Sequence, residues 1–327
     1  MARRSRLIVN FLLLISVVKA AEIDICPEGV LKYPDECEEK NVIPIKYHPG
    51  QPHDEYVLNR VCCKEVCGVR NYEIKANEFP SAVLILEETS IGPKKIVYSK
   101  CGGSLISANV VLTTAHCVEI IDKSKSYIAA GMLKAKHAED VLSDSYQKRY
   151  IDKIIKHEEF VSDAHLNNIA LIVLEKPFIL NRYVGTACFI SGDIDDDNCV
   201  VAGGDKPVIE HLRIIERDHC EKILRQTKLG SDFELHKTFT CAIGKQGKDA
   251  CLGDGGKALL CPLRGKNDEY SLVGMVSWGI DDKNNCDEKS VPGVYVDVYE
   301  YDKWIEQKFK EHNLNNDDTE DDYPLER

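Results

Sequence analysis

The pattern of hydrophobic and polar positions changes twice along the chain of 327 residues. Before residue 80, apolar runs are few apart from LIVNFLLLISVV at residues 7–18. From Pro80 to about Lys308, short runs rich in Val, Ile and Leu alternate with turn residues, as in SAVLILEE, VVLTTA, IALIVLE and YSLVGMVSW. Short apolar runs separated by turn residues predict many antiparallel strands, arranged as a barrel or a sandwich.

The C-terminal part has a helical pattern followed by an acidic one. The stretch VYEYDKWIEQKFKEH places Trp304, Ile305 and Phe309 on one face of a predicted helix. The tail at residues 313–327 is rich in Asp and Glu and has too few apolar residues to build a core. We therefore expect the tail to be disordered.

The N-terminal 20 residues have the pattern of a secretory signal peptide. Three arginines precede the apolar run, and Val18 and Ala20 suit the −3 and −1 positions of a cleavage site. A transmembrane anchor is the alternative, but the run is short for a membrane span and has the wrong flanks. We therefore expect a secreted, extracellular protein with no membrane partner.

The charge and the cysteines narrow the classes of partner and cofactor. Removal of the signal takes away four basic residues and lowers the formal charge from −12 to −16, which disfavours nucleic acid as a partner. Fourteen cysteines in an exported chain predict disulfides. A zinc site is the alternative, but the adjacent Cys62 and Cys63 suit two divergent bridges better than one tetrahedral ion. We expect no metal and no other cofactor.

A series of short motifs carries candidate chemistry. In chain order they read CGGSLIS (101–107), TTAHC (113–117), NNIALIVLEKP (167–177), DACLGDGGKALLC (249–261), SWG (277–279) and VPGVY (291–295). Over about residues 67–309 this series resembles the trypsin-like serine proteases. The resemblance implies a chymotrypsin-like fold: all-β, a double six-stranded β-barrel with a C-terminal helix.

The same resemblance implies a degenerate catalytic triad. His116 stands at the position of the general base, Asn168 at that of the aspartate, and Gly255 at that of the nucleophilic serine. The triad needs a hydroxyl to attack, an imidazole to take its proton and a carboxylate to orient the imidazole. Only the imidazole remains, so we expect an inactive serine protease homolog, a pseudoenzyme; a residual atypical protease is the alternative.

The resemblance also bears on activation. Trypsin-like zymogens are cut before an Ile-Val-Gly-Gly start, and the new ammonium pairs with the aspartate at the position of Asp254. The corresponding region reads NYEIKANEFPSAVLIL and has no such start, so we expect a chain that the usual cut does not switch on. Lys257 and Ala258 replace the Gly and Pro usual in the family, which places a long cation beside the former oxyanion hole.

Five residues correspond to remnants of the specificity pocket: Asp249, Ser277, Trp278, Gly279 and Gly293. Asp249 occupies the floor position that favours Arg or Lys in trypsin-like pockets. It either binds a basic side chain or is a solvated or internally paired carboxylate.

The family's pairings imply five disulfides: Cys101–Cys117, Cys199–Cys261, Cys220–Cys241, Cys251–Cys286 and Cys67–Cys188. Four cysteines remain to pair among themselves near the N-terminus: Cys26, Cys37, Cys62 and Cys63.

An N-terminal module that ends in CC, followed by CGVRN and EFP, resembles the clip-domain serine protease homologs of arthropods. We expect a signal peptide (1–20), a reduced clip-like module (21–66), a connector (67–79), a pseudoprotease domain (80–312) and the acidic tail (313–327). A clip domain has six cysteines and this module has four, so it departs from the clip pattern by two cysteines.

The subgroup implies a role in innate immunity, either as a haemolymph cofactor of prophenoloxidase activation in melanisation or as a venom-type antagonist of it. The partners would be a clip-domain serine protease, prophenoloxidase or both. The reduced clip, the absent activation start and the acidic tail favour the antagonist. A secreted pattern-recognition or adhesion protein is the alternative.

Overall fold

The computed structural model describes three short strands near the N-terminus and residues 67–72, 78–91, 94–131, 146–189, 193–203, 208–244, 254–266, 268–280 and 291–314. The chain divides into two compact units, Met1–Glu65 and Val66–Arg327. In the first unit, β1 (Gly29–Lys32), β3 (Val61–Lys64) and β2 (Val42–Ile43) form an antiparallel sheet in the order β1-β3-β2.

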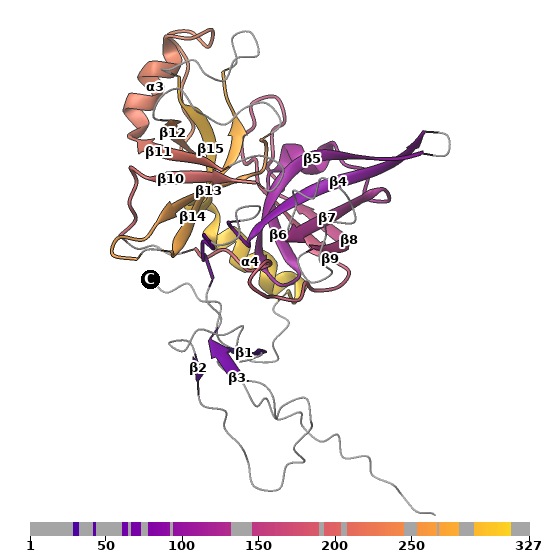
Figure 1. The fold of residues 1–327 in the computed structure, drawn as a ribbon. Coiled ribbons are helices and arrows are strands. Elements are labelled where there is room, and N and C mark those ends of the chain that lie inside the picture. Colours follow the sequence, from indigo (N-terminus) through magenta and orange to yellow (C-terminus); the bar gives the residue numbers. More distant parts are fainter. Residues whose placement is uncertain are drawn as a thin grey trace, which may run out of the picture. The chain divides into compact units, whose positions relative to one another are not determined.

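The second unit begins with a closed barrel of six antiparallel strands in the order β4-β5-β6-β9-β8-β7 (Figure 1). Its strands are β4 (Ala82–Ile91), β5 (Lys94–Ser107), β6 (Val110–Thr113), β7 (Ser126–Gly131), β8 (Tyr146–Lys156) and β9 (Ala170–Leu174). All five residues of β9 are buried, because its ALIVL sequence has no polar position to present to water.

A second closed barrel follows, in the order β10-β11-β12-β15-β14-β13. Its strands are β10 (Cys199–Ala202), β11 (Ile209–Ile215), β12 (Phe239–Gly244), β13 (Ala258–Pro262), β14 (Tyr270–Trp278) and β15 (Gly293–Asp297). Two closed six-stranded barrels confirm the expected chymotrypsin-like fold.

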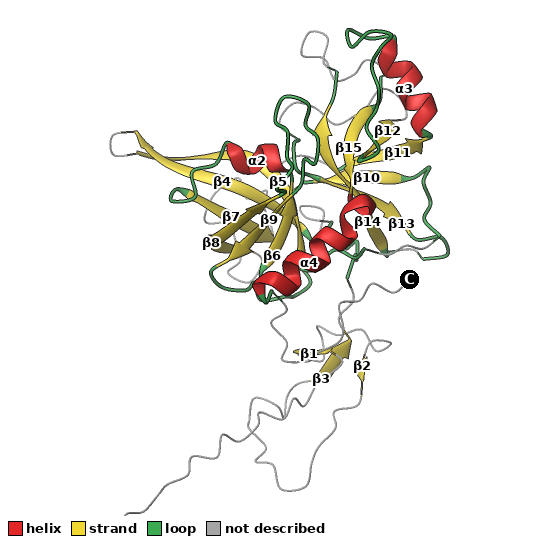
Figure 2. Ribbon diagram, turned by 180° about the vertical axis from the view of Figure 1, so that it is seen from behind, coloured by secondary structure: helices red, strands yellow, loops and turns green. Residues whose placement is uncertain are grey.

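Among the described residues, three α-helices accompany the barrels (Figure 2): α2 (Ala115–Glu119), α3 (Arg217–Arg225) and α4 (Asp302–His312). A 3₁₀ turn at Val298–Tyr301 leads into α4. Ile305 and Phe309 are buried as the helical pattern predicts. Trp304 is only half-buried, and its indole N–H donates to Glu158.

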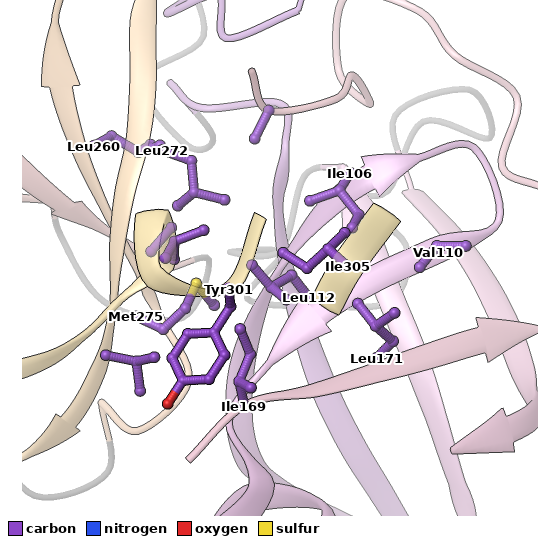
Figure 3. Packing of buried hydrophobic residues seen from close by; sticks show 14 of the residues in the cluster. Ile106, Val110, Leu112, Ile169, Leu171, Leu260, Leu272, Met275, Tyr301 and Ile305 are labelled. Atoms are coloured by element: carbon purple, nitrogen blue, oxygen red, sulfur yellow. The ribbon is translucent and has the colours of Figure 1, made fainter. Parts of the chain in front are cut away.

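The α4 helix closes the seam between the two barrels. One hydrophobic cluster joins Leu112 of β6, Met275 of β14 and Ile305 of α4, each at most 1% exposed. Figure 3 shows Tyr301 and Ile305 between side chains of the two barrels. Burial of large apolar side chains on both sides of the helix fixes the barrels to each other, and with them the loops that meet at their junction.

The segment expected to be a connector is partly built into the second unit. Cys67 forms a disulfide with Cys188, and Val69 pairs in an isolated bridge with Glu269. The described residues at 67–72 therefore lie against the second barrel. At the other end, Leu314 is 5% exposed, so the packed structure continues past residue 312.

Four disulfides occur among the described residues: Cys67–Cys188, Cys101–Cys117, Cys199–Cys261 and Cys220–Cys241. They join the same cysteines as the pairs that the resemblance implies. The predicted Cys251–Cys286 bridge, the pairing within the N-terminal module, the signal peptide and most of the acidic tail lie outside the described residues. In the part that is described, no helix combines the length and apolar character that a membrane span needs.

Candidate functional site

The barrel strands bring His116 and Asn168 together. His116 lies in α2, directly after β6, and Asn168 stands two residues before β9. Because β6 and β9 are paired, with Thr113 opposite Ala170, the two side chains meet at the same end of the sheet. Asn168 is fully buried, and its Nδ2 lies 2.8 Å from His116 Nδ1.

Gly255 comes from the second barrel, in the turn at residues 254–257 just before β13. Gly102 of β5 donates its N–H to the Gly255 carbonyl at 2.9 Å, which attaches the turn to the first barrel. Gly256 has a φ of +74°, and a Cβ there would approach Gly102 O and Thr113 Oγ1 to 2.5 Å. A larger residue cannot take this position, because both its backbone conformation and its close approach require glycine.

The His116 ring occupies the space beside Gly255. A Cβ added to Gly255 would meet His116 Nε2 at 2.6 Å, closer than real Cβ contacts. A serine would therefore have to displace the ring. As it stands, residue 255 has no atom that can attack a carbonyl.

The amide of Asn168 has one orientation and decides the tautomer of His116. Asn168 Oδ1 accepts from the backbone N–H of His116 at 2.9 Å, and a backbone N–H can only donate. The amide nitrogen consequently faces His116 Nδ1 at 2.8 Å and Ser277 Oγ at 2.8 Å. Nδ1 must accept, so the ring proton lies on Nε2, the nitrogen that a general base needs free.

Burial also keeps His116 uncharged. Burial, and secondarily the neighbouring His165, lower the pKa of His116 to about 4, and the charge of Glu119 opposes this shift only weakly. The two imidazole rings lie edge to face with centroids 5.5 Å apart. At neutral pH His116 is therefore a neutral imidazole that donates from Nε2.

The residues predicted to be pocket remnants do not behave as one group. Ser277 is buried and accepts the hydrogen bond from Asn168, so it belongs with the triad positions. Trp278 packs edge to face against Phe233 and Phe239. Apart from its chain neighbours, no described residue has a heavy atom within 4 Å of where a Cβ on Gly279 would stand.

Gly293 is buried at the start of β15, opposite Ala242 of β12. Asp249, the residue expected to bind a basic side chain, lies outside the described residues. Its role stays a prediction.

The Lys257 side chain is buried and is directed at Asp254. Its ammonium is 2.9 Å from Asp254 Oδ1, and each of the two side chains is 3% exposed. The cation is thus buried on a carboxylate three residues away. The spacing of three residues between Asp254 and Lys257 was the sequence signal from which this ion pair could have been predicted. No sequence signal indicates that His165 lies next to His116.

Three residues of a type that can bind a metal ion lie close together at this site. Cys101, His116 and Cys117 place ligand atoms within 4.8 Å of one another. The two cysteines are joined in a disulfide, so neither offers the thiolate that a transition metal binds.

The comparison with protein families identifies the fold's family. The family model described as Trypsin matches residues 69–305. The chain belongs to the trypsin family. This stretch contains both barrels together with His116, Asn168 and Gly255.

Among known members of the trypsin family, several with a clip domain are similar to this chain. It is 29% identical over 326 residues to inactive CLIP domain-containing serine protease A8 of Anopheles gambiae, with 86% of this chain and 85% of that protein aligned. It is 33% identical over 269 residues to phenoloxidase-activating factor 2 of Galleria mellonella, with 74% and 84% aligned. These relatives place this trypsin-family chain among the clip-domain serine protease homologs.

Proposed function

We propose that this chain is a secreted, non-catalytic regulator of the protease cascade that activates prophenoloxidase. In this proposal it binds the activating clip-domain protease, prophenoloxidase or both, and it acts as an antagonist of the venom type. The names of two relatives support the pathway: one is an inactive clip-domain protease and the other a phenoloxidase-activating factor. Disulfides are typical of exported proteins, which supports secretion.

The observation that carries the non-catalytic part is the arrangement around His116. We assign the inactivity to two replacements, Gly255 for the nucleophilic serine and Asn168 for the aspartate. Without a nucleophile at residue 255, and with the ring proton on Nε2, the site cannot start acyl transfer. What the barrels still offer a partner is a rigid surface with loops and an attached module.

The cascade role is tested in insect plasma triggered with a microbial elicitor. Phenoloxidase activity is measured with increasing amounts of the purified protein. A matched control is a trypsin whose nucleophilic serine is replaced by alanine, because it has the same fold and no activity. A dose-dependent fall with this protein alone supports the antagonist. A rise would make it a cofactor, and no change over a wide range of doses would refute the proposed pathway.

The partner is tested separately with purified components. The chain is immobilised, and binding of the activated clip-domain protease and of prophenoloxidase is measured one at a time. We expect saturable binding of at least one of them. Absence of binding to both, with the protein shown to be folded, would contradict the proposal even if plasma activity changed.

A further inference from the structure

A buried ion pair holds the turn beside His116. Lys257 Nζ lies 2.9 Å from Asp254 Oδ1, and each side chain is 3% exposed. An unpaired charge in the protein interior is strongly unfavourable, so a carboxylate at this depth requires a cation next to it. Here the chain itself supplies that cation, from the same turn.

Two glycines leave the space through which the Lys257 side chain runs. A Cβ on Gly102, in β5 of the first barrel, would meet Lys257 Cγ at 2.5 Å. A Cβ on Gly203, which follows β10 in the second barrel, would collide with Lys257 Cδ. The methylene stem therefore passes between the two barrels, and a side chain at either glycine would block it.

Backbone hydrogen bonds fix the same turn on both sides. Gly102 donates to the Gly255 carbonyl from the first barrel, and Gly256 donates to the Val276 carbonyl of β14, both at 2.9 Å. Lys257 accepts in turn from the Val276 N–H at 2.8 Å. The ion pair thus closes a turn whose backbone is already bonded to both barrels.

We propose that Lys257 is a built-in counter-ion that keeps the 254–257 turn formed in the uncut chain. A cut upstream would create a new N-terminal ammonium. To pair with Asp254, this group would have to displace the Lys257 ammonium, which is already there and belongs to a residue only three positions along the chain. The arrangement of His116, Asn168 and the turn is therefore the same before and after such a cut. The consequence for the cascade rests on the proposed function: the chain binds its partner without prior proteolysis.

The ion pair is tested by a double-mutant cycle with Lys257→Met, Asp254→Asn and the two combined. Each single substitution removes one charge of the buried pair and should raise the unfolding equilibrium constant roughly 10²–10⁴-fold. The combined variant, with both charges removed, should lose less than the two single effects together. Additive effects would show that the two side chains do not interact and would overturn the proposal.

Chemical rescue separates the charge from the packing. Lys257→Ala removes three methylenes and an ammonium, which are the atoms of n-propylammonium. We expect n-propylammonium to raise the melting temperature of Lys257→Ala more than n-propanol at equal concentration, with no difference between the two for the wild type. Equal effects of the ammonium and the alcohol on the variant would overturn the role of the charge.

Independence from cleavage is tested on a variant that retains Asp254 and Lys257 and carries a specific protease site at residues 73–77. Amide hydrogen exchange of peptides covering residues 254–257 is compared in the uncut and the cut protein, and we expect rates that agree within a factor of about two. A slowing of about tenfold or more after the cut would overturn the proposal, because the new N-terminus would then be ordering the turn.

Amide hydrogen exchange is measured without a binding partner, so it tests this inference independently of the proposed function. Equal exchange rates before and after the cut support the internal counter-ion. If neither the cut nor the uncut chain changes phenoloxidase activity, only the proposed cascade role is refuted. A phenoloxidase effect seen only with the cut chain would overturn the claim that binding needs no proteolysis.

Discussion

Restoring the serine by itself should not restore a protease. In the Gly255→Ser variant the new Cβ would stand 2.6 Å from His116 Nε2, and an ordinary contact begins at 3.4 Å, so the ring must withdraw by about 0.8 Å. After that movement the ring still has its proton on Nε2, because the Asn168 amide nitrogen continues to face Nδ1. The serine then meets a donor where it needs an acceptor.

The magnitude follows from the role of the carboxylate. An Asp-to-Asn change in a complete triad lowers turnover by about 10⁴, largely through the wrong tautomer. Part of that factor is local: to bring the ring into the active tautomer, two donors must face each other in a buried site, which costs about 1–3 kcal/mol. We therefore expect the double variant Gly255→Ser/Asn168→Asp to exceed Gly255→Ser alone by about 10⁴ in turnover.

The assay is hydrolysis of chromogenic Arg and Lys substrates by the wild type, the two single variants and the double variant. Labelling with a fluorophosphonate reports independently whether Ser at residue 255 is activated. His116→Ala in the double variant is the matched control and should return the rate to background. A Gly255→Ser variant as fast as the double variant would refute the argument that Asn168 sets the tautomer.

Two further predictions concern stability. The pKa of His116 is about 4 in the folded protein and 6.5 in the unfolded chain, so the unfolded chain takes up the proton first as the pH falls. The stability that comes from burying the neutral ring is therefore fully present above pH 6.5 and is lost as the pH falls towards 4. Between pH 7.5 and 4.5 the free energy of unfolding, measured with urea, should fall by about 2.5 kcal/mol through this effect, and the His116→Gln variant should not show this fall. The same dependence of unfolding free energy on pH in both proteins would contradict the burial of a neutral ring. Removal of the Cys67–Cys188 bridge, which spans 121 residues, by a double Cys→Ala substitution should lower the free energy of unfolding by about 2–5 kcal/mol. A melting temperature unchanged from the wild type in calorimetry would show that residues 67–72 contribute little to the second unit.

The short apolar runs were sufficient to predict the class of fold. Runs such as IALIVLE alternate with turn residues, and strand formation depends on that local pattern. The two-barrel arrangement and four of the disulfide pairs followed from the resemblance of the motifs and not from spacing, because spacing alone cannot decide which cysteines pair. The missing hydroxyl at Gly255 is equally a property of the sequence, since no arrangement in space can give glycine a side chain.

Other features depend on side-chain directions that no local pattern contains. Lys308 lies on the α4 face that is buried, where its ammonium reaches Glu158 and Glu311 at 2.6 Å, whereas the more apolar Trp304 is left half-buried. Helical periodicity predicts which residues share a face, but it does not predict which of them finds a carboxylate on a neighbouring strand or loop.

The sequence by itself therefore determined what is absent from the site: the hydroxyl at residue 255 and the carboxylate at residue 168. Only the tertiary structure decided what the remaining groups do. The orientation of the Asn168 amide depends on a backbone N–H from α2, and the partner of Lys257 depends on space left by glycines in two barrels. Hydrogen bonds and ion pairs of this kind join groups that are brought together only when the chain has folded, because their directions are set by packing across the whole unit.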